Sequence, residues 1–280
     1  MKKPQLILIS LGLLLFSVLY FFTPRFATSI GNSNTQSTEN QTVTTESILN
    51  TAKLALTENQ KISLLSIENQ LKSASNKGDS LKTLNALKQF WADSAQKLAP
   101  YLYFTYSAAL LENSEKSLTF AAQQLVDNLL TPDAPPALQP WIAGNAKVLL
   151  EKALVINPKN DSTKINLGAC YLFGNLSDNP MQGITKIKEV VDKDSTNSYG
   201  QFILALGGKK SGQYDKAIER FLTVLKIQPD HIEAMVHLAE CYELTNQKDL
   251  AIEWYTKVSN NVNIPEAKEA ISKRIQELKK

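Results

Sequence analysis

Residues 198–231 read SYGQFILALGGKKSGQYDKAIERFLTVLKIQPDH, and the spacing inside this stretch decides the fold. Two segments with apolar residues at helical spacing flank a turn at Gly212 and Tyr214. In the second segment Ala217 is followed four residues later by Phe221, and eight residues after that by Pro229. The stretch therefore predicts one helix, a tight turn and a second helix that stops before a proline.

The same offsets of four and eight residues recur elsewhere in the chain. They are found at Ala146/Leu150/Pro158, Gly183/Ile187/Ser195 and Ala251/Tyr255/Asn263. The first residues of the four sets lie 37, 34 and 34 residues apart, and an insertion in the loop 174–180 accounts for the longer spacing. With this period the chain resembles the tetratricopeptide-repeat (TPR) proteins, and the resemblance covers roughly residues 142–263.

The TPR pattern also has characteristic positions in the first helix of each unit. The predicted first helices of this chain match these positions in part. Leu167, Gly168 and Tyr171 have the expected spacing, as do Leu238, Ala239 and Tyr242, whereas the middle unit keeps only Leu204 and Ala205. Small residues are expected where two helices cross closely. An ordinary helical bundle with accidental spacing is the alternative, which four matches at one period disfavour. The repeat-defining residues are Gly168, Tyr171, Ala146, Pro158, Gly183, Ala217, Phe221, Pro229, Ala239, Tyr242, Ala251 and Tyr255.

The resemblance implies an all-α fold, a right-handed solenoid of helical hairpins, and the flanking sequence extends it. Residues 141–263 would hold about 3.5 TPR units, and 264–280 is an amphipathic segment that suits a capping helix. Residues 48–140 have helical periodicity with degenerate repeats. Four helices fit there, near 46–75, 80–97, 101–112 and 114–131, with Pro100 separating the second from the third.

The amino-terminal segment 1–26 predicts one transmembrane helix ahead of the solenoid. Residues 4–24 carry no charge, and the apolar run 6–22 would span a bilayer core of about 30 Å. Two lysines before the run, against one arginine after it, favour a domain on the non-cytoplasmic (periplasmic) side. A cleaved signal peptide is the alternative, although its apolar core is usually shorter. Residues 27–47 are rich in Ser, Thr, Asn and Gln, which predicts a flexible polar linker.

The charge balance gives no indication of a nucleic-acid partner. The chain has 30 basic and 27 acidic residues, and three of the basic ones, Lys2, Lys3 and Arg25, flank the apolar run. Beyond residue 27 the two signs balance. The basic pI of 8.6 therefore comes from the amino-terminal segment.

The sequence offers no catalytic constellation and no cofactor motif. His231 and His237 have no partner at metal-ligand spacing, and phosphate-binding or nucleophile motifs are missing from the sequence. Cys170 and Cys241 fall in helices two repeats apart, too far for a disulfide, which predicts two buried free thiols. We expect neither an enzyme nor a metal or cofactor site.

The TPR resemblance also implies a concave groove lined by the first helix of each unit. The residues expected in this groove are Ile165, Ala169, Phe173, Tyr199, Phe202, Leu206, Lys209, Lys210, Val236 and Glu240. Its apolar strip suits an amphipathic helix or an extended peptide, with Lys209 and Lys210 at one end and Glu240 and Glu243 at the other. Ile165 and Ala169 stand where chaperone-binding TPR proteins clamp a terminal carboxylate with Lys and Asn, which disfavours that class of partner.

The sequence thus predicts a membrane-anchored TPR scaffold or adaptor that binds another protein, as an assembly or chaperone-like factor at the cell envelope. The alternative is a structural, self-associating envelope subunit. In that case the groove would be filled by the chain's own helices or by a second copy.

Overall fold

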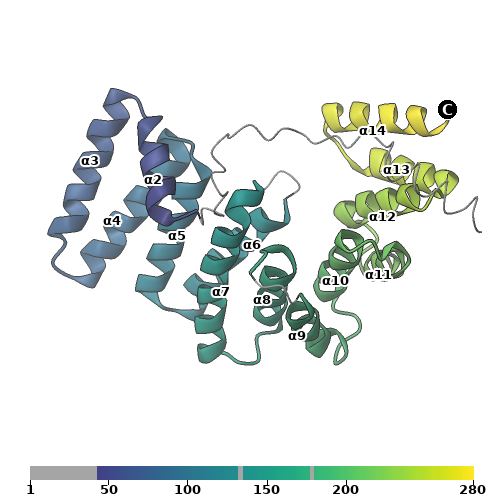
Figure 1. The fold of residues 1–280 in the computed structure, drawn as a ribbon, viewed down its shortest axis with the longest axis horizontal. Coiled ribbons are helices and arrows are strands. Elements are labelled where there is room, and N and C mark those ends of the chain that lie inside the picture. Colours follow the sequence, from purple (N-terminus) through teal and green to yellow (C-terminus); the bar gives the residue numbers. More distant parts are fainter. Residues whose placement is uncertain (1–42, 132–134, 177–179) are drawn as a thin grey trace, which may run out of the picture. The chain divides into compact units, whose positions relative to one another are not determined.

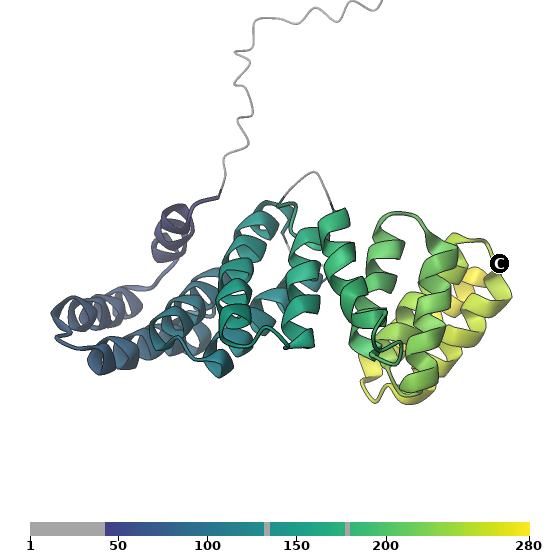
Figure 2. The same ribbon diagram turned by 90° about the horizontal axis from the view of Figure 1, so that it is seen from below.

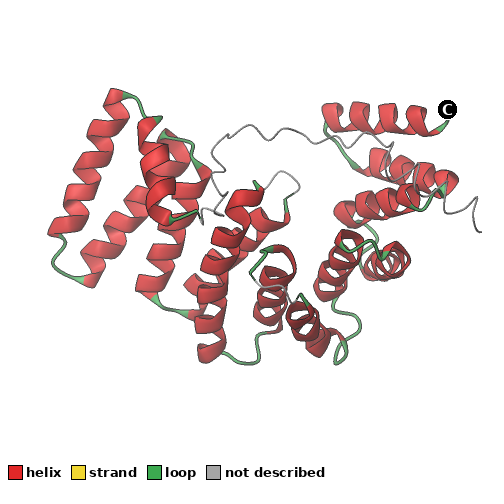
Figure 3. Ribbon diagram, in the orientation of Figure 1, coloured by secondary structure: helices red, strands yellow, loops and turns green. Residues whose placement is uncertain are grey.

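The computed structural model describes residues 43–131, 135–176 and 180–280. Over these ranges all regular elements are helical, and none is a strand (Figure 3). The predicted anchor at 6–22 and the linker up to residue 42 lie outside the described residues. Among the helices that the structure describes, none is both long and apolar enough to cross a membrane.

The amino-terminal helices differ in their boundaries from the prediction. They are α2 (Thr45–Leu54), α3 (Glu58–Ser73), α4 (Lys77–Gln89) and α5 (Leu98–Glu112), with a π-helical turn, η1 (Phe90–Ser94), after α4. The single helix expected over 46–75 is broken, because Thr57 starts a new helix with a capping box. Its Oγ1 accepts a hydrogen bond from the Gln60 backbone N–H at 3.3 Å, and its own N–H donates to Gln60 Oε1 at 3.0 Å.

Pro100 does not separate two helices, as the sequence suggested, but lies buried in the first turn of α5. A proline is tolerated there because the first backbone N–H groups of a helix have no intrahelical acceptor. The helices around it enclose a small core of their own. Its buried residues are Ala52, Leu56, Leu64, Leu87, Phe90, Trp91 and Phe104.

From residue 115 on, the described residues form four successive helix pairs, followed by one last helix (Figure 1). The pairs are α6 (Glu115–Leu130) with α7 (Gln139–Ile156), α8 (Asp161–Phe173) with α9 (Met181–Val191), α10 (Ser198–Lys210) with α11 (Tyr214–Ile227), and α12 (Ile232–Leu244) with α13 (Lys248–Asn261). A short 3-10 turn, η2 (Pro136–Leu138), precedes α7, and α14 (Pro265–Leu278) packs on α13. Each pair also packs on the next, a succession that Figure 2 shows from a second direction.

The turns within three of these pairs share one backbone conformation. Asn175, Gly212 and Asn246 have φ values of 50°, 73° and 58°. They follow α8, α10 and α12, and their spacing repeats the 37 and 34 residues of the sequence pattern. Glycine and asparagine adopt the left-handed conformation more readily than other residues. The recurring turn therefore has a local cause in the residue type at this position.

The starts of the same three pairs are also alike. The side chains of Asn160, Asn197 and His231 accept hydrogen bonds from the backbone N–H groups three residues later, at 3.0, 2.9 and 3.3 Å. Each therefore caps the amino terminus of α8, α10 or α12. His231 thus occupies the capping position that asparagine occupies in the two preceding pairs.

Small residues allow the paired helices to cross closely. A Cβ atom on Gly168 would lie 2.5 Å from Ile187 Cγ1, and one on Gly183 would lie 2.4 Å from the carbonyl oxygen of Gly168. At the positions equivalent to Gly183 the other second helices carry Ala146, Ala217 and Ala251, all fully buried. The larger repeat-pattern residues four positions later are Leu150, Ile187, Phe221 and Tyr255, and they are buried as well. The chain is a TPR-like helical-repeat protein.

One core runs through the repeats from α5 to α14. Cys170 in α8 and Cys241 in α12 belong to it as free thiols with no exposed surface, as predicted. Burial raises the pKa of Cys170 to about 12 and that of Cys241 to about 11. Both thiols therefore stay protonated at neutral pH and pack as small apolar side chains.

Candidate protein-binding groove

A hollow of about 570 Å³ lies between α6, α10 and α12. We refer to it as the groove. Its apolar lining consists of Leu130, Tyr199, Phe202, Leu206, Ile232 and Val236. Its polar lining consists of Asp127, Thr131, Glu233, His237 and Glu240. The groove is thus an apolar surface bordered by three carboxylates, formed by first helices from three of the four pairs.

Five of the ten residues expected to form a groove line this one. They are Tyr199, Phe202, Leu206, Val236 and Glu240. Lys209 stands beside them, since its ammonium group contacts Glu240. These residues come together because α10 packs against both α8 and α12, which aligns their first-helix faces.

Ile165 and Ala169 are not groove residues, contrary to the prediction. Both have no exposed surface and belong to the core. The physical reason is that α8 packs against α6 on one side and α10 on the other, so this part of its surface is covered. A Cβ atom on Gly200 of α10 would lie only 3.4 Å from Ile165 Cδ1. A partner could reach these two side chains only by separating the helices.

Phe173 and Lys210 also lie apart from the groove lining. The Lys210 Nζ atom donates a hydrogen bond to the carbonyl oxygen of Leu172 at 3.1 Å and stands 5.3 Å from the centre of the Phe173 ring. Lys210 therefore caps the carboxyl end of α8, where the helix dipole favours a cation. Burial lowers the pKa of this ammonium group.

Phe202 belongs partly to the core and partly to the groove. Its side chain is only 6% exposed, and its ring centre lies 5.9 Å from that of Phe221 and 4.8 Å from that of His231. The other apolar residues of the groove are half-buried and more accessible: Leu130, Tyr199, Leu206, Ile232 and Val236. A substitution at Phe202 would therefore disturb folding as well as any contact with a partner.

A cluster of three charged or titratable side chains closes one side of the groove. Glu240 Oε2 lies 2.7 Å from His237 Nδ1 on the same helix, and it accepts a hydrogen bond from Lys209 Nζ on α10. Burial by itself would raise the pKa of Glu240, but the hydrogen bonds from His237 and Lys209 and the nearby lysine charge lower it to about 2. Glu240 is therefore ionised at all physiological pH values, and it ties α12 to α10.

The opposite charges were expected at opposite ends of the groove, and the structure corrects this expectation. Lys209 pairs directly with Glu240, so the two charges offset each other at one place. Glu243 instead forms an ion pair with Arg274 of α14 and accepts a hydrogen bond from Tyr255 Oη of α13 at 3.3 Å. The direction of a bound peptide is thus not set by the charge arrangement that the sequence suggested.

A chain of hydrogen bonds fixes Tyr199 at the wall of the groove. The Tyr199 hydroxyl donates to Asn166 Oδ1, Asn166 Nδ2 donates to Gln123 Oε1 at 2.6 Å, and Gln123 Nε2 donates to Asp127 Oδ1 at 2.6 Å. Burial raises the pKa of the Tyr199 hydroxyl to about 12. These three hydrogen bonds link α10, α8 and α6 and end on the Asp127 carboxylate of the groove. The wall of the groove is therefore preorganised.

Sequence reasoning missed five groove residues, and a sixth, Glu233, occupies a concave position of its repeat but was not among the ten expected residues. Asp127 and Leu130 come from the last turn of α6, and Thr131 directly follows this helix, whose sequence lacks the repeat pattern. Ile232 and Glu233 open α12, and His237 lies one turn further on. The i, i+3 spacing of His237 and Glu240 is a signal that could have identified this pair.

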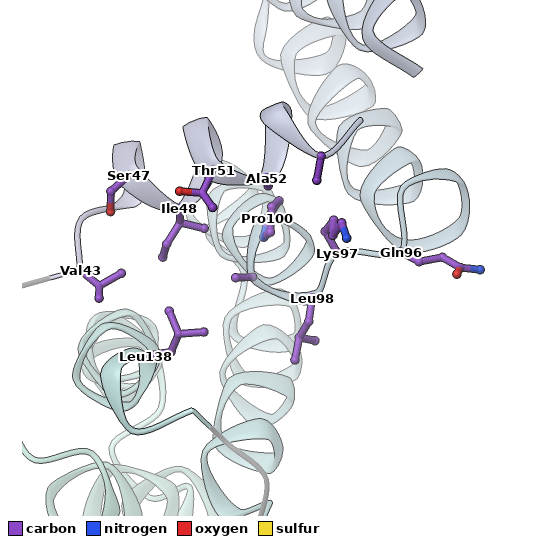
Figure 4. A pocket seen from close by; sticks show the side chains of 12 residues that line it. Val43, Ser47, Ile48, Thr51, Ala52, Gln96, Lys97, Leu98, Pro100 and Leu138 are labelled. Atoms are coloured by element: carbon purple, nitrogen blue, oxygen red, sulfur yellow. The ribbon is translucent and has the colours of Figure 1, made fainter. Parts of the chain in front are cut away.

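A second hollow, of about 520 Å³, lies apart from the groove between α2, the start of α5 and Leu138 (Figure 4). The side chains of Ile48 and Leu138 point into it from opposite sides (Figure 4). Its lining is mostly apolar, with Ser47, Thr51 and Lys97 among the polar members. No group of three or more His, Cys, Asp or Glu side chains that could hold a metal ion occurs in the described parts of the chain.

Comparison with known protein families gives a match over the carboxyl-terminal part of the chain. The family model of the regulator of microtubule dynamics proteins 1-3 matches residues 202–280. This range runs from α10 to α14 and is less than half of the chain. Comparison with curated proteins gave no match.

Several solved structures are similar in fold at low identity. MamA shares 16% identity, with coverage of 71% of this chain and 94% of MamA and a TM-score of 0.41. MamA from Desulfovibrio magneticus RS-1 shares 18%, with coverage of 66% and 97% and a TM-score of 0.41. YrrB, described as a TPR protein with an unusual peptide-binding site, shares 17%, with coverage of 74% and 97% and a TM-score of 0.42. These values are too low to carry any function over to this chain.

Proposed function

We propose that this protein is a non-enzymatic scaffold or adaptor that binds a segment of another protein in the groove between α6, α10 and α12. The observation that carries the proposal is the combination of half-buried Leu206 and Val236 with the rigidly held Tyr199 in one hollow of about 570 Å³. Apolar grooves between repeat helices accommodate an amphipathic helix or an extended peptide. A preorganised wall reduces the entropy cost of binding.

The charges of the groove favour a basic partner segment. Asp127, Glu233 and Glu240 line it, while Lys209 is the cation in contact with one of them. Glu240 is already paired, which leaves Asp127 and Glu233 as exposed carboxylates at the border of the apolar surface. Lysine or arginine residues beside the apolar face of a partner helix would complement them and speed association.

Two model peptides test this proposal. Both are amphipathic helices with the same leucine face, and their polar faces carry either lysine or glutamate. We expect the lysine peptide to bind the full-length protein at least tenfold more tightly in fluorescence polarisation, and the difference to shrink at high salt. Equal affinities, or tighter binding of the glutamate peptide, would contradict the charge assignment.

The site is tested by a double variant and a matched control. Leu206→Ser with Val236→Ser removes two half-buried apolar side chains of the groove, and binding of the lysine peptide should fall at least tenfold. Leu222→Ser removes an apolar side chain that is 39% exposed on α11 and does not line the groove, so binding should be unchanged. Similar losses in the two proteins would place the peptide elsewhere.

The cellular setting that we propose follows from the amino-terminal sequence. The uncharged run 6–22 would anchor the chain in a membrane, and the two preceding lysines would keep the amino terminus in the cytoplasm. The repeats would then act on the non-cytoplasmic side, as an assembly or chaperone-like factor of the cell envelope. The polar linker would give the groove freedom to reach partners, over roughly 25 Å for about 20 flexible residues.

A further inference from the structure

Helix α6 borders another hollow besides the groove, which lies between α4, α5 and α6. Its volume is about 240 Å³. The buried residues of its lining are small: Thr105, Ala108, Ala109 and Ala121. Along the array α6 lies between α4 and α5 on one side and α10 and α12 on the other (Figure 1). We refer to this hollow as the α4–α6 hollow.

One face of α6 connects the α4–α6 hollow with the groove. Lys116, Phe120, Gln123 and Asp127 follow one another at spacings of four, three and four residues, which places them on the same side of the helix. Lys116 and Phe120 line the α4–α6 hollow, and Asp127 lines the groove. The lysine and the aspartate lie about 17 Å apart along the helix axis, at 1.5 Å per residue. We refer to these four residues as the α6 face.

Phe120 is a large apolar side chain between the two hollows, and it is 61% exposed. Leu118 and Ala122 lie on the opposite side of α6 and are fully buried in the core. The packing of α6 on its neighbours therefore does not depend on Phe120. An aromatic side chain in this position, beside a hollow on each side, is suited to contact with an apolar residue of a partner.

The two hollows carry unpaired charges of opposite sign. Lys88 and Lys116 line the α4–α6 hollow, and neither ammonium group has an ion pair or hydrogen bond within the described residues. Glu112 lines it as well, so the two lysines leave an excess of positive charge. Asp127 and Glu233 line the groove, and neither carboxylate contacts a cation in the same parts of the chain. The surface is therefore positive at one end of the α6 face and negative at the other.

Resting on the function proposed for the groove, we infer that the bound partner segment continues across the α6 face and ends in the α4–α6 hollow. The segment has basic residues at one end and acidic residues at the other, with an apolar residue between them that contacts Phe120. As a helix, it needs about three turns between its two charged ends to span about 17 Å. A uniformly basic or uniformly acidic segment would meet like charge at one end, so the arrangement selects both the partner and its direction.

Peptides with two charged ends test this inference. All are helices with one leucine face and lysines at one end, and the other end, about three turns away, carries either glutamates or glutamines. Each is made with its lysines at the amino end and, separately, at the carboxyl end, because a helix can lie on the face in either direction. In one of these directions we expect the glutamate peptide to bind the full-length protein at least tenfold more tightly than the glutamine peptide in fluorescence polarisation.

Two other results of this measurement are distinguishable. If the glutamate and glutamine peptides bind equally well in both directions, the groove is occupied but the partner does not reach the α4–α6 hollow, and the inference is wrong while the proposed function stands. If no peptide with a lysine end binds, the proposed function fails, and the inference fails with it.

A middle variant tests whether the peptide crosses the α6 face. Phe120→Ser should weaken binding of the glutamate peptide at least fivefold, and it should leave unchanged the binding of a shorter lysine peptide that covers the groove alone. An undiminished affinity for the glutamate peptide would contradict a path across this face.

The double variant Lys88→Gln with Lys116→Gln tests the positive end. It should abolish the preference for the glutamate peptide and leave the affinity for the glutamine peptide unchanged. The matched control is Lys152→Gln with Lys188→Gln, which removes two exposed lysines of α7 and α9 that line neither hollow, and it should keep the preference. A preference that survives in the first variant, or that is lost equally in both, would overturn the inference.

Discussion

At the scale of a single residue, Ala217 shows how closely the two helices of a repeat pack. Its side chain is fully buried, and a Cβ atom on Gly208 of α10 would lie 3.4 Å from the Ala217 Cβ atom. We expect Ala217→Trp to lower the free energy of unfolding by about 1–3 kcal/mol or more, because the larger side chain would force α10 and α11 apart. Urea denaturation checks this value. Exposed Glu219 on the same helix is the control, and equal unfolding midpoints for Ala217→Trp and Glu219→Ala would be incompatible with this packing.

The residues that define the repeat could be found from the sequence because each constraint recurs at one spacing. Ala146, Gly183, Ala217 and Ala251 leave a pattern, since a close helix crossing admits only a small side chain at each of these places. The turn residues Asn175, Gly212 and Asn246 recur in the same way, although only Gly212 was recognised as a turn residue. Asparagine is also common outside such turns, so Asn175 and Asn246 were weaker indications of a turn than Gly212.

At the scale of helices the prediction of the groove was less complete. Which face of a helix meets solvent depends on the neighbours it acquires, and α8 lies between α6 and α10. Ile165 and Ala169 were therefore expected in the groove but are buried. The pairing of Lys209 with Glu240 was also beyond the sequence pattern, because it joins side chains 31 positions apart and depends on how α10 packs beside α12.

The interaction of Glu240 on α12 with Lys209 on α10 predicts that the stability of the protein depends on pH. The pKa of Glu240 is about 2, below its ordinary value of 4.5, so the ionised form is favoured by folding. Its contribution is present above about pH 4.5 and is lost as the pH falls toward about 2. We expect Glu240→Gln to melt below the unsubstituted protein near neutral pH, and the difference in melting temperature to disappear in acid.

The control for this experiment is Glu253→Gln, which removes an exposed ion pair with Lys257 on α13. Exposed pairs of this kind contribute little to stability, so its melting temperature should follow that of the unsubstituted protein at every pH. A Glu240→Gln variant with the same behaviour as this control would show that the link between α10 and α12 contributes nothing to stability.

At the scale of the whole molecule, the testable prediction concerns membrane anchoring by the amino-terminal segment. If the run 6–22 is an uncleaved anchor, the chain should begin at Met1 and stay with membranes after a carbonate wash, because about 30 Å of apolar helix resists extraction. Amino-terminal sequencing and membrane fractionation check both parts. A mature amino terminus near Ile30 would instead identify a cleaved signal peptide.

The two buried thiols have a consequence for how the opening of this array can be followed. Cys170 lies in α8 and Cys241 in α12, and neither has exposed surface. An alkylating reagent can therefore reach each sulfur only during a local unfolding event in its own part of the array. In a repeat protein such events need not be concerted along the chain. The modification rates of the two cysteines therefore report separately on the local unfolding of two different repeats. No cysteine has to be introduced for this measurement.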